Sequence, residues 1–303
     1  MRPRGPAAAL ATAAVLLAAC SSAPASPSGK ITAVGAENEY ASVIGQIGGR
    51  YVSVTAVESN PNTDPHTFEA SPSVAQQVSA AQLVVQNGLG YDTYMNKIEA
   101  AAPDARRRVI GVQSLLRLPD STPNPHLWYD PRTMPAVARA VESSLAVLQP
   151  GHAAYFRGRL RAFDQSLQPW YQALARFKAT YPRAPVAVTE PVGDYMLQAA
   201  GARILTPFRL QADIMNGVDP APQDVASESG LLSGHKVRAL LYNQQVTDPL
   251  TASFLARARQ YGIPVVGMYE TMPAPGYNYQ SWMLAEVSAL QKALAGHAST
   301  QKL

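Results

Sequence analysis

The sequence predicts an α/β protein of two lobes with mainly parallel sheets, joined by one long backbone helix. Short apolar runs alternate with amphipathic stretches along the chain, a pattern typical of parallel strands covered by helices. Near the middle, residues 151–182 have helical periodicity and little strand character, and the alternation resumes after them. We therefore expect an N-terminal lobe over residues 30–150, a linking helix over 151–182 and a C-terminal lobe over 183–303.

Each expected lobe contains four strand-like runs. The first four are KITAVGAEN, YVSVTAVES, AQLVVQNG and RRVIGVQ, and the second four are APVAVTEP, ARILTPF, VRALLYNQQ and IPVVGMYE. Helical patterns lie between or after these runs, in EYASVIGQIGG, SPSVAQQVSA, YDTYMNKIEAA, DVASESGLLSG, DPLTASFLARARQYG and NYQSWMLAEVSALQKALAG.

The segment 151–182 is interpreted as the connection between the lobes. Its apolar residues recur at steps of three to five, and Pro169 is expected to kink the helix. At about 1.5 Å per residue, about 30 residues reach roughly 45 Å, which is longer than a crossover helix needs to be. An ordinary long helix within a single domain is the alternative.

The N-terminus has the features of an export signal, residues 1–19. A short positive region, MRPRG, precedes the apolar run AAALATAAVLLAA, which falls short of the about 20 residues that span a bilayer. The run ends in LAAC, where Cys20 is the only cysteine in the chain. This sequence resembles a bacterial lipobox, in which the cysteine is lipidated; an ordinary signal peptide with a chance cysteine, or an uncleaved anchor, is the alternative. Residues 20–29 then form a lipidated tether, so we expect an extracytoplasmic protein anchored to the bacterial cell membrane.

Composition narrows the class of protein further. Apolar residues make up 47% of the chain and charged residues 15%, which favours a globular protein over a disordered one. The formal net charge of +4 falls to +2 without Arg2 and Arg4 of the expected signal peptide. The mature chain is therefore nearly neutral, and no nucleic-acid partner is expected.

Two histidines occupy matched settings, although the chain contains only five. His66 in NTDPHTFEASP and His126 in PNPHLWYDP each follow a proline and precede an expected helix start, Ser71 with Pro72 after the first and Asp130 with Pro131 after the second. In open α/β sheets, ligands bind at loops of this kind. A surface turn explains one such motif, but two favour a shared role as a base, a hydrogen-bond donor or a metal ligand.

Two glutamates supply further candidate ligands. Glu190 ends the apolar run in VAVTEP and Glu270 ends the run in PVVGMYET, so both carboxylates are expected to face a crevice. Together with the two histidines they form a four-ligand set, two from each lobe. An acid stabilised at a helix N-terminus is the alternative for either glutamate.

The motifs DPHTFEASP and NPHLWYDP together resemble the substrate-binding lipoproteins of zinc and manganese ABC transporters, and the resemblance extends over the mature chain. It implies a metal site between the lobes, with His66 and His126 as the N-lobe ligands and Glu190 and Glu270 at the positions of the C-lobe ligands. It also implies one transported Zn²⁺ or Mn²⁺ ion, a cognate ABC permease as partner, a lipid anchor at Cys20 and a monomer without enzymatic activity. Residues 67–125 contain no histidine, whereas the zinc members often carry a histidine-rich loop there.

The expected function is therefore capture of a divalent transition metal ion and its delivery to a permease. The His₂Glu₂ set leans towards Mn²⁺ because of its oxygen ligands, although Zn²⁺ should bind more tightly in vitro. A two-lobed binding lipoprotein for an organic solute and a secreted metallohydrolase are the alternatives. The chain lacks an H-E-x-x-H motif, which disfavours the hydrolase.

Overall fold

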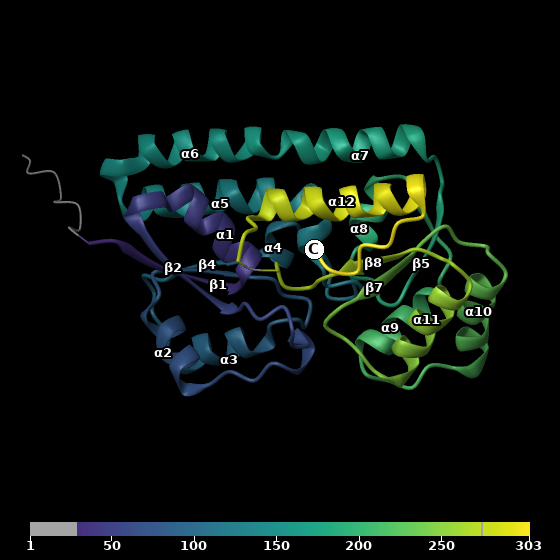
Figure 1. The fold of residues 1–303 in the computed structure, drawn as a ribbon. Coiled ribbons are helices and arrows are strands. Elements are labelled where there is room, and N and C mark those ends of the chain that lie inside the picture. Colours follow the sequence, from purple (N-terminus) through teal and green to yellow (C-terminus); the bar gives the residue numbers. More distant parts are fainter. Residues whose placement is uncertain (1–28, 274) are drawn as a thin grey trace, which may run out of the picture.

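The computed structural model describes residues 29–273 and 275–303, so the expected signal peptide, Cys20 and most of the tether lie outside the described residues. Two parallel sheets lie side by side beneath a layer of helices that runs across both of them (Figure 1). The expected α/β class with two lobes is confirmed. Within the described part of the chain, no helix is both long enough and apolar enough to cross a membrane.

The N-terminal sheet has the strand order β2-β1-β3-β4, and all its pairs are parallel. Its strands are β1 (Ile31–Glu37), β2 (Val52–Glu58), β3 (Leu83–Gln86) and β4 (Arg108–Gly111). The helices of this lobe are α1 (Asn38–Gly48), α2 (Pro72–Ala80), α3 (Thr93–Ala101), α4 (Val112–Leu115) and α5 (Thr133–Leu148). Short 3-10 helices are η1 (Gly49–Tyr51), η2 (Pro65–Thr67), η3 (Leu127–Tyr129) and η4 (Pro150–His152).

The C-terminal sheet repeats the same order, β6-β5-β7-β8, again with parallel pairs. Its strands are β5 (Pro185–Val188), β6 (Arg203–Ile204), β7 (Leu240–Asn243) and β8 (Val265–Met268). The helices are α8 (Asp194–Ala199), α9 (Phe208–Met215), α10 (Pro222–Ser233), α11 (Pro249–Gln260) and α12 (Tyr279–Gly296). All eight strand-like runs of the sequence therefore contain a strand.

The helix that links the lobes consists of two consecutive segments, α6 (Ala153–Ser166) and α7 (Gln168–Thr180), which lie end to end along one side of the molecule (Figure 1). The division falls at the fully buried Leu167, just before Pro169. Proline has no N–H to donate to the preceding turn, which accounts for the interruption of the helix at this point.

The main hydrophobic core is continuous from one lobe to the other. Helices α1, α5 and α12 lie between the sheets and the α6–α7 segment, and the buried side chains of Trp128, Trp170 and Trp282 belong to one cluster. Smaller clusters lie beneath the outer helices of each lobe. The two lobes consequently share a packed layer instead of being joined by the linking segment alone.

Two expected helix starts have different outcomes. Ser71 caps α2 as expected, since its hydroxyl accepts from the backbone N–H of Val74. The expectation for Asp130 and Pro131 is wrong, because α5 begins only at Thr133. The Asp130 carboxylate instead accepts from the backbone N–H and guanidinium of Arg132, which holds a turn before the helix.

Candidate metal centre

Three of the four predicted ligands lie together between the lobes. The Nε2 atoms of His66 and His126 each lie 3.1 Å from Oε2 of Glu270. One ligand atom from each residue lies within 4.8 Å of the other two, and no other such group of three occurs among the residues that the structure describes. His126 and Glu270 are fully buried, whereas 20% of the His66 side chain is exposed. The exposed part of His66 does not include Nε2, which is buried, so the cluster is covered by the protein and only the rest of this ring meets solvent.

The carboxyl ends of the strands position these side chains. His66 lies in η2, after β2, and its backbone N–H donates to the Asp64 side chain at 2.8 Å. His126 immediately precedes η3, and Glu270 lies two residues beyond the end of β8. Because both sheets are parallel and their strand order reverses beside the first strand of each lobe, these loops line a crevice of the kind where open α/β sheets bind ligands.

Asn124 fixes the orientation of His126. Its Oδ1 accepts from the backbone N–H of His126 at 3.0 Å and lies 2.8 Å from the ring Nδ1. A carbonyl oxygen can only accept, so Nδ1 carries a proton and the lone pair of the neutral ring is on Nε2, which faces the cluster. Asn124 also donates to the carbonyl of Pro191 at 2.7 Å and accepts from the Tyr195 hydroxyl at 2.9 Å. The loop of His126 is thereby bonded to the C-terminal lobe.

Glu270 lies at the centre of the hydrogen-bond network. The Tyr91 hydroxyl donates to Oε2 at 2.9 Å, and the Asn243 amide donates to Oε1 at 2.7 Å. The Gln245 side chain accepts from the Glu270 backbone N–H at 2.7 Å and donates to the Thr63 carbonyl at 2.8 Å, which connects Glu270 to the loop of His66. Burial alone raises the pKa of Glu270, but the two imidazoles outweigh it and hold that pKa below its usual range.

The two histidines differ in their protonation. Burial lowers the pKa of His126, and the nearby Glu270 carboxylate only partly offsets this effect. Burial also lowers the pKa of His66, but here the Glu270 carboxylate and Asp64 outweigh it, so the net shift is upward. Although His66 Nε2 lies close to the carboxylate, its alignment does not make a hydrogen bond. His66 therefore keeps an unsatisfied ring nitrogen facing the cluster.

Glu190, the fourth predicted ligand, lies beside the cluster but outside it. Its Oε1 accepts from the Asn243 amide at 3.1 Å, and the same amide bonds Glu270. Its other oxygen, Oε2, is buried and has no hydrogen-bond partner among the described residues. Burial and the neighbouring Glu270 carboxylate both raise the pKa of Glu190. One amide thus separates two carboxylates that repel one another when both are ionised.

The arrangement fits a transition-metal ion. Ligand bonds of about 2.0–2.2 Å in a tetrahedral shell place neighbouring donors about 3.4 Å apart, close to the 3.1 Å between the imidazole nitrogens and Glu270 Oε2. The unsatisfied His66 Nε2 and Glu190 Oε2 are the buried polar atoms that a cation would satisfy. Two imidazoles and one or two carboxylates suit Zn²⁺ or Mn²⁺.

Three further acids lie behind the cluster, at the carboxyl ends of β1 and β2. Glu37, Glu39 and Glu58 are buried, and their carboxyl oxygens have no hydrogen-bond partner among the described residues. Burial, reinforced by the neighbouring acids, raises the pKa of Glu37 and Glu39 and raises that of Glu58 to about 8. Burial therefore favours the neutral form of all three acids, whereas the pKa of Glu270 is shifted in the opposite direction.

Four residues that hold the candidate ligands in place were not predicted from the sequence. Asn124 was within reach, because it stands two residues before His126 in the quoted motif. Asn243 and Gln245 end a predicted strand, where a polar residue is a weak signal. Tyr91 gave no signal, because its contact with Glu270 joins residues from different lobes.

The chain is similar to metal-binding proteins in sequence. The model of the family described as zinc-uptake complex component A, periplasmic (ZnuA) matches residues 34–293. The zinc-binding protein TroA of Treponema pallidum is 30% identical over 112 residues, 35% of this chain and 36% of that protein. The manganese-binding lipoprotein MntA of Bacillus subtilis is 23% identical over 137 residues, 43% of this chain and 44% of that protein. The matched segments thus span less than half the length of these curated relatives.

Solved structures share the fold over most of the chain. The TroA structure from Treponema pallidum superposes with a TM-score of 0.74 at 19% identity, covering 89% of this chain and 100% of that one. The Mn-bound periplasmic metal binding protein of Candidatus Liberibacter asiaticus gives a TM-score of 0.72 at 16% identity, covering 88% of this chain and 100% of that one. Because the family model extends over nearly all the described residues, the protein belongs to the family of periplasmic zinc-uptake complex component A.

Proposed function

We propose that this protein captures a divalent transition metal ion, Zn²⁺ or Mn²⁺, outside the cytoplasm and delivers it to the permease of an ABC transporter. The convergence of His66, His126 and Glu270 at a buried point between the lobes is the observation that carries the proposal. Membership of a zinc-uptake family supports it, as do the names of TroA and MntA, which are zinc- and manganese-binding proteins.

The proposed coordination shell is His66, His126, Glu270 and Glu190. Glu190 joins when the cation neutralises the repulsion between the two carboxylates, because its free Oε2 is already buried beside Glu270. This His₂Glu₂ shell gives half its ligands as oxygen, which suits Mn²⁺, while the Irving–Williams order still favours Zn²⁺ when the two ions compete in vitro. The ion is the cargo of the protein and takes part in no reaction.

The proposed cellular context follows from the N-terminus. LAAC, with Cys20 as the only cysteine in the chain, supports lipidation and attachment to the cell membrane. The receptor is then an extracytoplasmic, lipid-anchored monomer whose partners are the ion and the permease.

The alternative functions fit the site less well. A hydrolase with a bound metal needs a free base and an open coordination position, whereas Glu270 already contacts both histidines, Tyr91 and Asn243. A receptor for an organic solute needs a cavity next to the histidines. The cavity beside His66 is lined by Phe68, Tyr94 and Lys97 but not by His126, so only one of the two histidines could meet a solute there.

The test is elemental analysis of the chain from Ser21, purified without chelator or metal-affinity tag, followed by competitive titration with Zn²⁺ and Mn²⁺. We expect about one ion per chain. His66→Ala and His126→Ala should each lose most of the affinity, because each removes one of about four ligands. His152→Ala is the matched control, since His152 stacks on Tyr51 in the N-terminal lobe, away from the cluster.

The outcomes separate the hypotheses. An unchanged dissociation constant in both site variants would remove His66 and His126 from the shell. A wild-type chain that contains no stoichiometric metal and takes up none would reject the receptor for metal ions and favour an organic solute. Hydrolysis that depends on the bound ion would favour the enzyme.

A further inference from the structure

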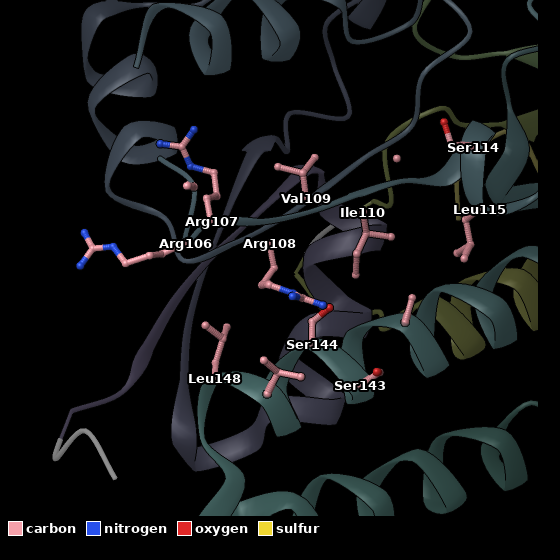
Figure 2. A pocket seen from close by; sticks show the side chains of 14 residues that line it. Arg106, Arg107, Arg108, Val109, Ile110, Ser114, Leu115, Ser143, Ser144 and Leu148 are labelled. Carbon is pink, nitrogen blue, oxygen red and sulfur yellow. The ribbon is translucent and has the colours of Figure 1, made fainter. Parts of the chain in front are cut away.

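A shallow groove of about 760 Å³ lies on the N-terminal lobe, lined by residues on either side of the His126 loop in the sequence. It follows the edge strand β4 and is bounded by the turn before β4, by α4 and by the C-terminal half of α5 (Figure 2). Neither His66 nor His126 lines it. The groove is therefore a feature separate from the metal centre.

The groove collects exposed apolar side chains. Val109, Leu115 and Val147 line it and are 44%, 37% and 59% exposed. Only two other large apolar residues, Phe208 and Val218, are comparably exposed in the described part of the chain, and both lie in the other lobe. Single exposed apolar residues are common, but their concentration in one place is typical of an interaction surface.

The same groove carries a run of three arginines. Arg107 is tied to the protein, because its guanidinium donates to the carbonyls of Ser79 and Ala81. Arg106 contacts Asp104 at 3.3 Å, but its side chain is 92% exposed. Arg108 makes no ion pair or side-chain hydrogen bond within the described residues, and its side chain reaches across the groove towards Ser144 (Figure 2). Two guanidinium groups are thus available to an anionic partner.

The groove lies at the end of the lobe where the chain enters the fold. The Gln149 side chain donates to the carbonyl of Gly29 at 2.7 Å, and the neighbouring Leu148 lines the groove. Ten residues, 21–30, separate Cys20 from β1, and a fully extended chain of that length spans at most about 35 Å. A lipid on Cys20 therefore holds this end of the N-terminal lobe close to the membrane.

We propose that the groove is a membrane-contact surface that binds anionic phospholipid. The guanidinium groups of Arg106 and Arg108 contact headgroup phosphates, and Val109, Leu115 and Val147 enter the interfacial region. Basic side chains bordered by apolar ones are the combination that holds a protein at an anionic bilayer surface. The position of the groove near the membrane depends on the proposed lipidation of Cys20, whereas its charge and its apolar surface do not.

The experiment uses the unlipidated chain from Ser21 and vesicles of phosphatidylglycerol with phosphatidylcholine, or of phosphatidylcholine alone. We expect partitioning onto the anionic vesicles that weakens with salt. The double variant Arg106→Gln/Arg108→Gln should partition roughly tenfold to thirtyfold less, since each basic residue near an anionic surface contributes about fivefold. The matched control is Arg176→Gln/Arg203→Gln, which removes the same charge from exposed positions outside the groove.

A second measurement places the surface directly. The chain from Ser21 has no cysteine, so Val147→Cys and Phe208→Cys can each carry one environment-sensitive fluorophore. A blue shift on anionic vesicles at position 147 but not at 208 supports the orientation.

Any of four outcomes would overturn the proposal. Equal loss of partitioning in both double variants would mean that the whole charge of the protein acts, not the groove. Equal binding to anionic and neutral vesicles would exclude an anionic lipid as the ligand, and a blue shift at position 208 instead of 147 would exclude this surface. Binding to detergent-solubilised permease through Arg106 and Arg108 would show that the groove contacts a protein partner. Metal affinity measured in the same variants should stay unchanged, so a failure here is distinct from a failure of the receptor function.

Discussion

Glu286 offers a test of how the core beneath the metal centre depends on protonation. This residue lies on α12 and is fully buried. Its Oε1 accepts from the Trp282 indole at 3.0 Å and lies 3.3 Å from the Tyr129 hydroxyl, which also contacts the carbonyl of Tyr269, next to Glu270. Burial raises the pKa of Glu286 to about 8. At neutral pH the folded protein therefore holds a proton on Glu286 that the unfolded chain releases.

The sign and size of the effect follow from this difference. The folded pKa is raised above the ordinary value of 4.5, so the contribution to stability is present below pH 4.5 and is lost as the pH rises towards the folded pKa. Between pH 6 and pH 8 the loss is about 2 kcal/mol, because each unit inside the window costs up to about 1.4 kcal/mol. Glu286→Gln keeps the accepting oxygen, has the shape of the neutral acid and cannot ionise, so it should escape this loss.

The assay is urea unfolding of the metal-free protein, followed by tryptophan fluorescence at pH 6 and pH 8, for the wild type and Glu286→Gln. We expect the wild type to lose about 2 kcal/mol more than the variant over this interval. Other buried acids titrate in both proteins, so they cancel in the difference. If the two proteins lose the same free energy of unfolding, Glu286 is not protonated in the folded state and the assignment of neutral buried acids here is wrong.

Three further predictions concern the site and the contact between the lobes. Ion affinity should fall roughly tenfold or more from pH 7 to pH 5, because protons compete with the metal for the histidine nitrogens. They reach His66 first, since its pKa is raised, and His126 later, since its pKa is lowered. Metal retention that stays constant in a titration from pH 7 to pH 4.5 would contradict this. Tyr91→Phe removes a donor to Glu270 and should weaken ion binding about tenfold, measured by competition with a chelating dye, with the fold intact by circular dichroism. Asn38→Ala removes two buried hydrogen bonds to the backbone of the other lobe. It should lower the free energy of unfolding, measured in urea, by about 1–3 kcal/mol. An unchanged unfolding midpoint would mean that these bonds do not stabilise the contact between the lobes.

Local signals in the sequence were sufficient for the fold class and for placing the candidate ligands at the ends of its elements. Each strand is a short apolar run, and Pro169 divides the linking helix as the chemistry of proline requires. His66 and His126 can be recognised in the sequence because each lies in a proline-bounded turn between elements. A histidine in such a turn is not part of an apolar strand or helix face. Glu270 is visible because it follows an apolar run directly. In each case the determining interactions lie within a few residues of the position concerned.

The relation between the two glutamates could not be predicted in the same way. Glu190 and Glu270 both follow a strand of the same sheet, but only Glu270 contacts the histidines, because that contact depends on how the lobes approach one another. The Asn243 amide between the two carboxylates is fixed by the pairing of β7 with its neighbours. The sequence does not show which strands are neighbours closely enough to predict a single side-chain hydrogen bond between them.

The charge of the site explains why Glu190 lies near Glu270 without joining its cluster. Ionised Glu270 accepts from a tyrosine hydroxyl and an amide, and either neighbouring imidazole stabilises it further when its Nε2 carries a proton. A second ionised carboxylate beside it shares only the Asn243 amide as a donor, and burial together with the Glu270 charge raises the pKa of Glu190. A divalent cation reverses this balance, since it supplies the charge that both carboxylates lack and takes the lone pairs of both imidazoles. In the proposed receptor, ion binding therefore draws Glu190 into the shell and releases protons from Glu190 and His66. Because these protons occupy the ligand atoms in the absence of metal, only a cation that displaces them can bind.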